Sequence, residues 1–294
     1  MNSPDVIFPN LNITINNLNQ IAFSIFGMQI YWYGIFVAMG VIAGIGIALW
    51  NVKRMGGNPN LYSDFALYVV PACIVGTRLF YVAFRWEYFR HDLGSIFAFR
   101  DGGLAIYGAI IAAFLTALIF CKIKKISFFN FVDLGIIGLP LGQAIGRWGN
   151  FFNREVFGRS TDSLFAMQYR FDEVSRGMMS QDMIDNPMFV DGVRYIQVHP
   201  TFLYESVWNL ATVVVLYIFM KHRKFQGQIA AMYLLLYGIG RFWIEALRLD
   251  TDALRMGSIP ISQALSGIMA VAAAGFIVVN FVLKYRKKTE GETA

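Results

Sequence analysis

Seven stretches of the chain are almost continuously apolar and long enough to cross a membrane as helices. Their lengths match the roughly 17–25 residues that a helix needs to span the hydrocarbon core. They lie at residues 31–50, 64–84, 103–121, 131–152, 201–220, 229–247 and 259–283. The pattern predicts an all-α polytopic membrane protein with about seven transmembrane helices. We expect a single transmembrane domain that covers residues 1–294.

Two segments outside these stretches mix polar and apolar residues. Residues 153–200 carry acids and arginines but no lysine, and they predict a small extracytoplasmic insertion between spans four and five, with strands at Phe165–Phe171 and Val193–Val198. Residues 5–30 mix asparagine with isoleucine and phenylalanine, which favours short strands or an interfacial helix. No internal repeat is visible in the sequence, and this weighs against a transporter built from inverted halves.

Composition and charge fit this interpretation and add an orientation. The chain is 56% hydrophobic and only 15% charged, which is too apolar for a soluble domain of 294 residues. The nine lysines follow apolar segments in four places: Lys53; Lys122, Lys124 and Lys125; Lys221 and Lys224; Lys284, Lys287 and Lys288. This distribution predicts cytoplasmic loops at those places, an outside N-terminus and an inside C-terminus. The net charge of +6 therefore reflects basic loops on the cytoplasmic side of the membrane and does not indicate nucleic-acid binding.

Other features limit the chemistry and the processing of the chain. Residues 1–20 hold no lysine or arginine and no small-residue cleavage site follows them, so we do not expect a cleaved signal peptide. Cys73 and Cys121 lie in apolar stretches and are interpreted as packed hydrophobic side chains. No cysteine–histidine spacing indicates a metal, no glycine-rich nucleotide loop is present, and we expect no cofactor.

The end of the fourth apolar stretch, Gly146–Glu155, gathers polar groups at membrane depth. A central arginine costs roughly 2.5–3.5 kcal/mol to insert, so such residues usually face a cavity and carry function. Arg147, Asn150 and Asn153 are each three residues apart and share one helix face. Two interpretations remain open here, namely hydrogen bonds between helices made by the asparagines, and a polar site for an anion.

The sixth apolar stretch carries a second polar stripe. Tyr237, Arg241, Glu245 and Arg248 are spaced four, four and three residues apart, which places them on one side of a helix. An Arg241–Glu245 ion pair could simply neutralise a buried charge. The alternative is an anion site in which Arg241 binds a phosphate and Glu245 orients it. Two arginines on different spans favour a shared anionic ligand.

Four further motifs stand at the ends of apolar stretches. His199 and Pro200 open the fifth stretch, with Glu205 deeper in the same helix. The Asp101-Gly102-Gly103 turn precedes the third stretch, where it is either a simple tight turn or a source of free backbone N–H groups for an anion. Tyr31-Trp32-Tyr33-Gly34 opens the first stretch, where aromatic residues are usually interface anchors. Arg78 is a further buried cation for which the sequence names no partner.

Taken in order, these motifs resemble the phosphatidylglycerol–prolipoprotein diacylglyceryl transferase family of bacteria, over nearly the whole chain. The most specific part is the run Gly146-Arg147-Trp148-Gly149-Asn150-Phe151-Phe152-Asn153-Arg154-Glu155-x-x-Gly158. The shorter motifs that also match are Tyr33-Gly34, Asp101-Gly102-Gly103, His199-Pro200-x-x-Leu203-Tyr204-Glu205 and Tyr237-Gly238-x-x-Arg241.

The resemblance implies a seven-span enzyme of the bacterial inner (cytoplasmic) membrane. Such an enzyme moves the diacylglyceryl group of phosphatidylglycerol to the thiol of the lipobox cysteine in a prolipoprotein signal peptide, and it releases glycerol phosphate. On the family pattern the key residues are Arg147 and Arg241. The residues that the pattern implies as supporting groups are Tyr33, Asn150, Glu155, Gly158 and Tyr237. Beyond the family pattern, we expect further binding or supporting groups at Asn153, Glu205, Glu245 and the Gly102–Gly103 backbone.

One position departs from the family pattern. Tyr107 stands where the family commonly has a histidine that has been proposed as the general base, and tyrosine is a poor base at neutral pH. A thiol of pKa about 8.5 is already a few per cent thiolate at pH 7, so the loss of a base costs only about 30-fold. If a base is needed, His199 is the candidate to replace it; otherwise His199 is a helix cap or an interface residue. Tyr107 could still donate a hydrogen bond to the phosphate. A transporter or flippase of anionic lipids or solutes is the alternative function.

Overall fold

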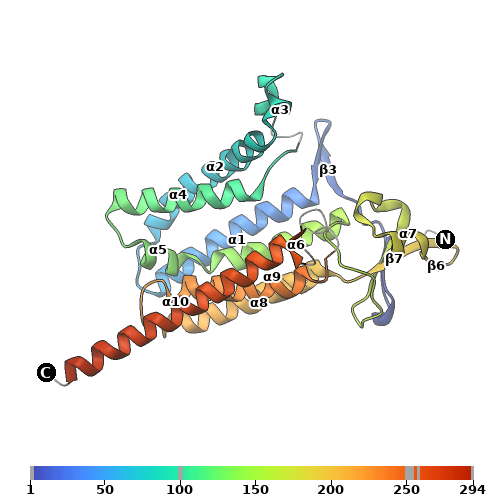
Figure 1. Ribbon diagram of the computed structural model, residues 1–294. Helices are drawn as coiled ribbons and strands as arrows, with labels where there is room; N and C mark the ends of the chain where they lie inside the picture. The colour runs from blue at the N-terminus through green and yellow to red at the C-terminus, as the bar shows by residue number, and fades with distance from the viewer. Residues whose placement is uncertain (1–2, 99–101, 249–254, 257–258, 293–294) are drawn as a thin grey trace. The chain divides into compact units, whose positions relative to one another are not determined.

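The computed structural model describes residues 3–98, 102–248, 255–256 and 259–292, which fold into two compact units (Figure 1). The large unit comprises Met1–Gly46 and Ile136–Ala294, and the small unit comprises Ile47–Gly135. The first helix, α1 (Trp32–Arg54), runs from the large unit into the small one.

The small unit is built mainly on two antiparallel helices. Its elements after α1 are α2 (Pro59–Phe84), α3 (Trp86–Phe89), the 3-10 helix η2 (Leu93–Phe97), α4 (Ile106–Lys124) and α5 (Phe128–Gly135). The α2 helix starts where the Asn58 side chain accepts a hydrogen bond from the Asn60 N–H at 3.0 Å, with Pro59 in the first turn. Gly76 lets α2 approach α4, because a β-carbon there would lie 2.6 Å from the Gly108 carbonyl.

The long helices of the large unit are packed against one another in sequence order. They are the first part of α1, α6 (Gly138–Asn153), α8 (Thr201–Met220), α9 (Gln228–Glu245) and α10 (Ile261–Glu292). The α1 and α6 helices meet through paired glycines. A β-carbon on Gly40 would lie 2.7 Å from the Gly142 carbonyl, and one on Gly44 would lie 2.7 Å from the Gly138 carbonyl. The two helices therefore touch along their backbones.

A five-stranded antiparallel sheet gathers at one end of these helices (Figure 1). Its strand order is β2-β1-β5-β7-β6, with β2 (Ile13–Ile15), β1 (Val6–Phe8), β5 (Met167–Arg170), β7 (Val193–Val198) and β6 (Met188–Val190). The shorter elements of the unit are η1 (Pro9–Leu11), η4 (Phe171–Glu173), η5 (Arg176–Met178), α7 (Gln181–Asp185), the hairpin β3 (Ile21–Ile25) with β4 (Met28–Tyr31), and the pair β8 (Arg255–Met256) with β9 (Ile259–Pro260).

The buried core of the large unit joins the sheet to the helix ends. Strand residues Val6, Met167 and Ile196 are at most 1% exposed and pack with the aromatic side chains of α6 and α8. The Phe151 and Phe202 rings lie 4.8 Å apart between their centroids, which fixes the end of α6 against the start of α8. The sheet thus holds the polar ends of these two helices together.

Helices occupy all seven stretches that the hydropathy pattern predicts, and the chain is an all-α polytopic membrane protein outside its small sheets. Five described helices are long and apolar enough to cross a membrane, namely α1, α2, α4, α8 and α10, and the interrupted pair α5–α6 is a sixth when counted as one span. The α9 helix is less apolar because it carries Gln228, Arg241 and Glu245. The count of seven therefore stays a prediction.

The two mixed segments form strands. Within residues 153–200, β5 and β7 occupy the two predicted strand positions and pair with each other. Residues 5–30 form β1 to β4 around the short helix η1, which agrees with the strand alternative. The side of the membrane on which this sheet lies, and the assignment of one domain, stay predictions.

Candidate functional site

The polar residues of three helices in the large unit meet at one carboxylate. Glu205 of α8 forms an ion pair of 2.6 Å with Arg147 of α6 and lies 3.5 Å from Arg241 of α9. Arg248, just after α9, lies 3.7 Å from the same carboxylate. We call Arg147, Glu205, Arg241, Glu245 and Arg248 the arginine cluster.

The spacing of residues on α9 explains the position of Glu245, the second carboxylate of the cluster. Glu245 lies one turn after Arg241 on α9, and their charged groups are 2.5 Å apart, as the i, i+4 spacing predicts. The hydroxyl of Ser262, in the first turn of α10, donates a hydrogen bond of 2.5 Å to the other oxygen of Glu245. Gly238 permits this contact between helices, because a β-carbon there would lie 2.7 Å from the Ser266 carbonyl.

The acids of the cluster are buried more deeply than the arginines. The side chains of Glu205 and Glu245 are 4% and 2% exposed, whereas those of Arg147 and Arg241 are 26% and 17% exposed. The carboxylates therefore lie behind the guanidinium groups and hold them in place. The open sides of Arg147 and Arg241 present N–H donors in the planar arrangement that binds phosphate oxygens.

The end of α6 adds a hydrogen-bonded chain to the cluster. Arg147 donates to the Asn150 side-chain oxygen at 3.3 Å, and the Asn150 amide donates to Glu155 at 2.9 Å. Asn153 donates to the same Glu155 oxygen at 3.3 Å. Glu155 thus reaches Arg147 through Asn150, whereas Glu205 binds that arginine directly. The predicted face of Arg147, Asn150 and Asn153 is present.

Tyr33 lies against α6 because the glycine contacts fix the alignment of α1. A β-carbon on Gly149 would lie 2.9 Å from the Tyr33 ring, so only glycine fits there. Tyr33 lies seven residues before Gly40 on α1, and Gly149 lies seven residues after Gly142 on α6. The contact between Gly40 and Gly142 is therefore consistent with the contact between Tyr33 and Gly149.

Tyr237 of α9 lies near a second tyrosine. Its ring lies 5.9 Å from the Tyr233 ring, whose hydroxyl accepts a hydrogen bond from Gln143.

Gly158 occupies a crowded junction beside His199. Its N–H donates to the His199 carbonyl at 3.0 Å, and a β-carbon would lie 2.8 Å from both the His199 β-carbon and the Leu247 carbonyl. The His199 ring lies 3.3 Å from the Tyr204 hydroxyl. Partial burial lowers the pKa of His199 below its usual 6.5, so the ring is neutral at neutral pH.

Comparison with known proteins decides the family. The profile of prolipoprotein diacylglyceryl transferase matches residues 20–279. The chain belongs to that family. Curated relatives named phosphatidylglycerol–prolipoprotein diacylglyceryl transferase include one from Finegoldia magna, 41% identical over 92% of this chain and 97% of the relative. The relative from Clostridioides difficile is 39% identical over 92% and 98%, and the one from Bacillus cytotoxicus is 39% identical over 91% and 94%.

Three residues that the family resemblance implies lie in the small unit. Tyr107 stands in the first turn of α4, and its ring contacts Phe80 at 6.1 Å between centroids. Gly102 and Gly103 have φ angles of +83° and +73°, which glycine adopts without strain. Asp101 lies outside the described residues. How these residues relate to the arginine cluster stays a prediction.

The structure identifies the partners of Arg78, which the sequence left open. This α2 side chain is 4% exposed and donates to the carbonyl oxygens of Ser95 and Gly102 at 2.6 Å, Ile96 at 2.8 Å and Gly103 at 3.1 Å. Backbone carbonyls are present at every residue, so no sequence pattern could have indicated these contacts. Arg78 fixes the turn that precedes α4.

Two more residues near the site escaped the sequence prediction. Ser262 holds Glu245, but a single serine at a helix start carries no distinctive signal. Arg154, within the signature run, is directed away from the arginine cluster because it ends α6 in the left-handed conformation, with φ 53°.

Among the described residues, no group of three or more His, Cys, Asp or Glu side chains is arranged to hold a metal ion.

Proposed function

We propose that this chain transfers the diacylglyceryl group of phosphatidylglycerol to the lipobox-cysteine thiol of a prolipoprotein. The observation that carries the proposal is the pair of partly exposed arginines, Arg147 and Arg241, which one buried carboxylate, Glu205, draws together from two helices. Family membership supports the reaction class.

The reaction needs a stabilised phosphate leaving group. In the proposed mechanism Arg147 and Arg241 bind the phosphate, the cysteine sulfur attacks the terminal glyceryl carbon, and a sulfur–carbon bond forms as the carbon–oxygen bond to phosphate breaks. Glycerol phosphate leaves with one more negative charge on its phosphate. Guanidinium groups that are already in position stabilise this growing charge more in the transition state than in the ground state.

The remaining residues are assigned supporting roles. Asn150, Tyr33 and Tyr237 are proposed to contact the lipid headgroup, while Glu155, Asn153 and Glu245 orient the groups that do so. The thiol proton passes to His199 or to water, and His199 is in its neutral, proton-accepting form at neutral pH because burial lowers its pKa. Tyr107, Gly102 and Gly103 are assigned to phosphate binding on sequence grounds alone.

The membrane setting follows the same proposal. Several apolar helices make the chain a multi-pass membrane protein. Family membership supports the bacterial cytoplasmic membrane, and the lysine pattern supports an orientation with the N-terminus outside and the C-terminus inside. Phosphatidylglycerol would enter sideways from the bilayer, with its phosphate near the outer face.

The decisive experiment incubates the purified protein with phosphatidylglycerol vesicles and a lipobox-cysteine peptide. We expect mass spectrometry to show a diacylglyceryl group on the thiol, with glycerol phosphate released. Arg241→Ala should abolish the product although the variant still inserts and accumulates, since one preorganised donor is worth about 100-fold or more. Arg176→Ala, at an exposed arginine of η5, is the matched control and should keep full activity.

Two outcomes would contradict the proposal. Full activity of Arg241→Ala would remove this arginine from the mechanism. Absence of any adduct from folded protein, under conditions in which the relatives are active, would favour a lipid or solute transporter instead.

A further inference from the structure

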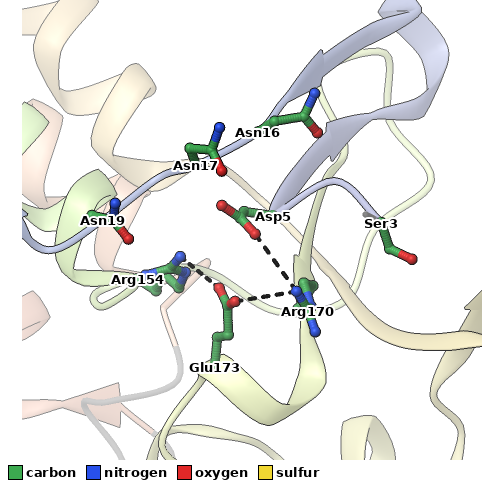
Figure 2. A pocket seen from close by; sticks show the side chains of 8 residues that line it. All are labelled: Ser3, Asp5, Asn16, Asn17, Asn19, Arg154, Arg170 and Glu173. Carbon is green, nitrogen blue, oxygen red and sulfur yellow. Dashed lines mark ion pairs between the residues drawn. The ribbon is translucent and has the colours of Figure 1, made fainter. Parts of the chain in front are cut away.

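A second polar region of the large unit lies apart from the arginine cluster. It is a cavity of about 370 Å³ between the N-terminal segment and the residues that follow α6 and β5 (Figure 2). Every residue that lines it is polar: Ser3, Asp5, Asn16, Asn17, Asn19, Arg154, Arg170 and Glu173. Figure 2 shows the three asparagines on one side, with Arg154, Glu173 and Arg170 opposite them. The family mechanism described above uses none of these side chains.

The asparagine side of the cavity is held in place through Leu18. The Leu18 N–H donates to Asp5 at 2.6 Å, and its carbonyl accepts from Arg154 at 2.6 Å. Its side chain is 5% exposed and belongs to the core of the large unit. Asn17 takes the left-handed conformation, with φ 59°, which asparagine tolerates well. The three amide groups are therefore carried on an anchored segment.

Arg154 occupies its backbone conformation at a cost. A non-glycine residue with a φ angle of 53° is strained, because its β-carbon crowds the following carbonyl oxygen. Its side chain is 7% exposed and forms a 2.5 Å ion pair with Glu173, besides its bond to Leu18. Because these contacts offset the strain, the opposite side of the cavity is also fixed.

Arg170 is held less tightly and keeps donors for a ligand. Its guanidinium lies 3.7 Å from Asp5 and 3.6 Å from Glu173, and both distances exceed hydrogen-bonding range. The side chain is 34% exposed, so an acceptor in the cavity can reach the guanidinium.

The charges of the cavity favour a neutral ligand. Two arginines are matched by two carboxylates, so a phosphate or carboxylate would meet Asp5 and Glu173 as well as the arginines. Asparagine amides both donate and accept hydrogen bonds, which suits a ligand with alternating donors and acceptors. A peptide backbone has that chemistry. The strand β2 ends at Ile15, directly before Asn16, and it is an edge strand of the described sheet, a position at which extended chains can pair.

We infer that this cavity binds an extended, polar stretch of the precursor polypeptide, next to the cysteine that receives the lipid. The inference rests on the proposed function. Arg154 follows Asn153 and precedes Glu155, so one short segment of chain contributes to both the cavity and the polar end of α6. A polypeptide held at the cavity would therefore lie next to the chain segment that ends α6.

The test compares two peptides in the mass-spectrometric assay. The long peptide carries polar residues beyond the lipobox cysteine, and the short one ends directly after it. Asn16→Trp should fill the cavity and raise KM for the long peptide about tenfold, the worth of two neutral hydrogen bonds, to the value for the short peptide. Its kcat, its KM for phosphatidylglycerol and its KM for the short peptide should not change.

Two more conservative substitutions test the cavity with less risk of misfolding than Asn16→Trp. Asn17→Asp adds a third carboxylate to the cavity and should raise KM for the long peptide about threefold. Asn12→Asp is the matched control, because Asn12 is also exposed and left-handed, with φ 54°, but does not line the cavity. It should leave both peptides unaffected.

A photo-crosslinking amino acid at position 16 gives a readout that does not depend on turnover. We expect it to capture the long peptide and not the short one. Equal KM values for the two peptides in the unmodified protein, or capture of labelled phosphatidylglycerol in place of peptide, would overturn the inference while leaving the transfer reaction intact. If neither peptide is modified, the proposed function fails, and capture of the long peptide still decides whether the cavity binds polypeptide.

Discussion

Glu205 is the residue on which the arginine cluster depends, because it contacts Arg147, Arg241 and Arg248. Glu205→Gln keeps the shape of the side chain but removes the shared negative charge. We expect kcat/KM for diacylglyceryl transfer to fall roughly 100-fold, since a displacement of about 1 Å in positioning groups has that effect.

The matched control for this change is Glu87→Gln. Glu87 forms an ion pair with Arg90, but its side chain is 79% exposed and such surface pairs are worth little. The control should keep its activity and abundance. An active Glu205→Gln variant would mean that the arginines are held by other contacts.

His199 carries a prediction about pH. Burial places its folded-state pKa below 6.5, so the ring stays neutral at neutral pH and loses its basic form only as the pH falls through that lowered value. If His199 is the base, kcat/KM should fall on the acid side of pH 6.5. His199→Gln should lower the plateau and remove that acid limb.

The same pKa has a consequence for stability. The unfolded chain binds the proton at its ordinary pKa near 6.5 while the folded chain still resists it, so folding stability is lost as the pH drops below that value. His222→Gln is the control, because His222 is exposed and caps the end of α8 through the Ile218 carbonyl. Identical pH profiles of kcat/KM for His199→Gln and His222→Gln would exclude His199 as the base.

At the scale of elements, hydropathy predicts helices well and their interactions poorly. Long apolar runs determine α1, α2, α4, α8 and α10, and β5 and β7 lie at the two strand positions predicted within the polar insertion. The ion pair of Arg241 with Glu245 was predictable because a helix brings residues four apart together. No such rule joins Arg147 to Glu205, which are 58 positions apart on different helices.

The sequence likewise did not show which helices pack against each other. The glycines at 40, 44, 138 and 142 are visible in the sequence, but which glycine meets which depends on how the helices align. The sequence also did not indicate which way the Arg154 side chain points. Its neighbours in the signature run are polar and face the cluster, whereas a left-handed residue at a helix end turns its side chain toward Glu173.

At the scale of the whole molecule, the lysine pattern predicts which parts of the chain face the cytoplasm. In the large unit the sheet adjoins the start of α8, and Lys221 and Lys224 follow the other end of that helix. A helix of 20 residues spans about 30 Å, so these two ends should lie on opposite sides of the bilayer.

Labelling of single cysteines checks this orientation. In a background that lacks Cys73 and Cys121, Arg176→Cys should react with a membrane-impermeant thiol reagent added to intact cells. His222→Cys should react only after the membrane is permeabilised. Labelling of His222→Cys in intact cells would reverse the topology and place the sheet on the cytoplasmic side.

The backbone contact between α1 and α6 also restricts how homologous chains can differ in length. Each residue of a helix turns the chain by about 100°, so one residue inserted between Tyr33 and Gly40 would swing Tyr33 away from Gly149. A deletion between Gly142 and Gly149 would have the same effect. Evolutionary insertions and deletions should therefore be absent from residues 33–44 and 138–149 and should accumulate in the connections between helices.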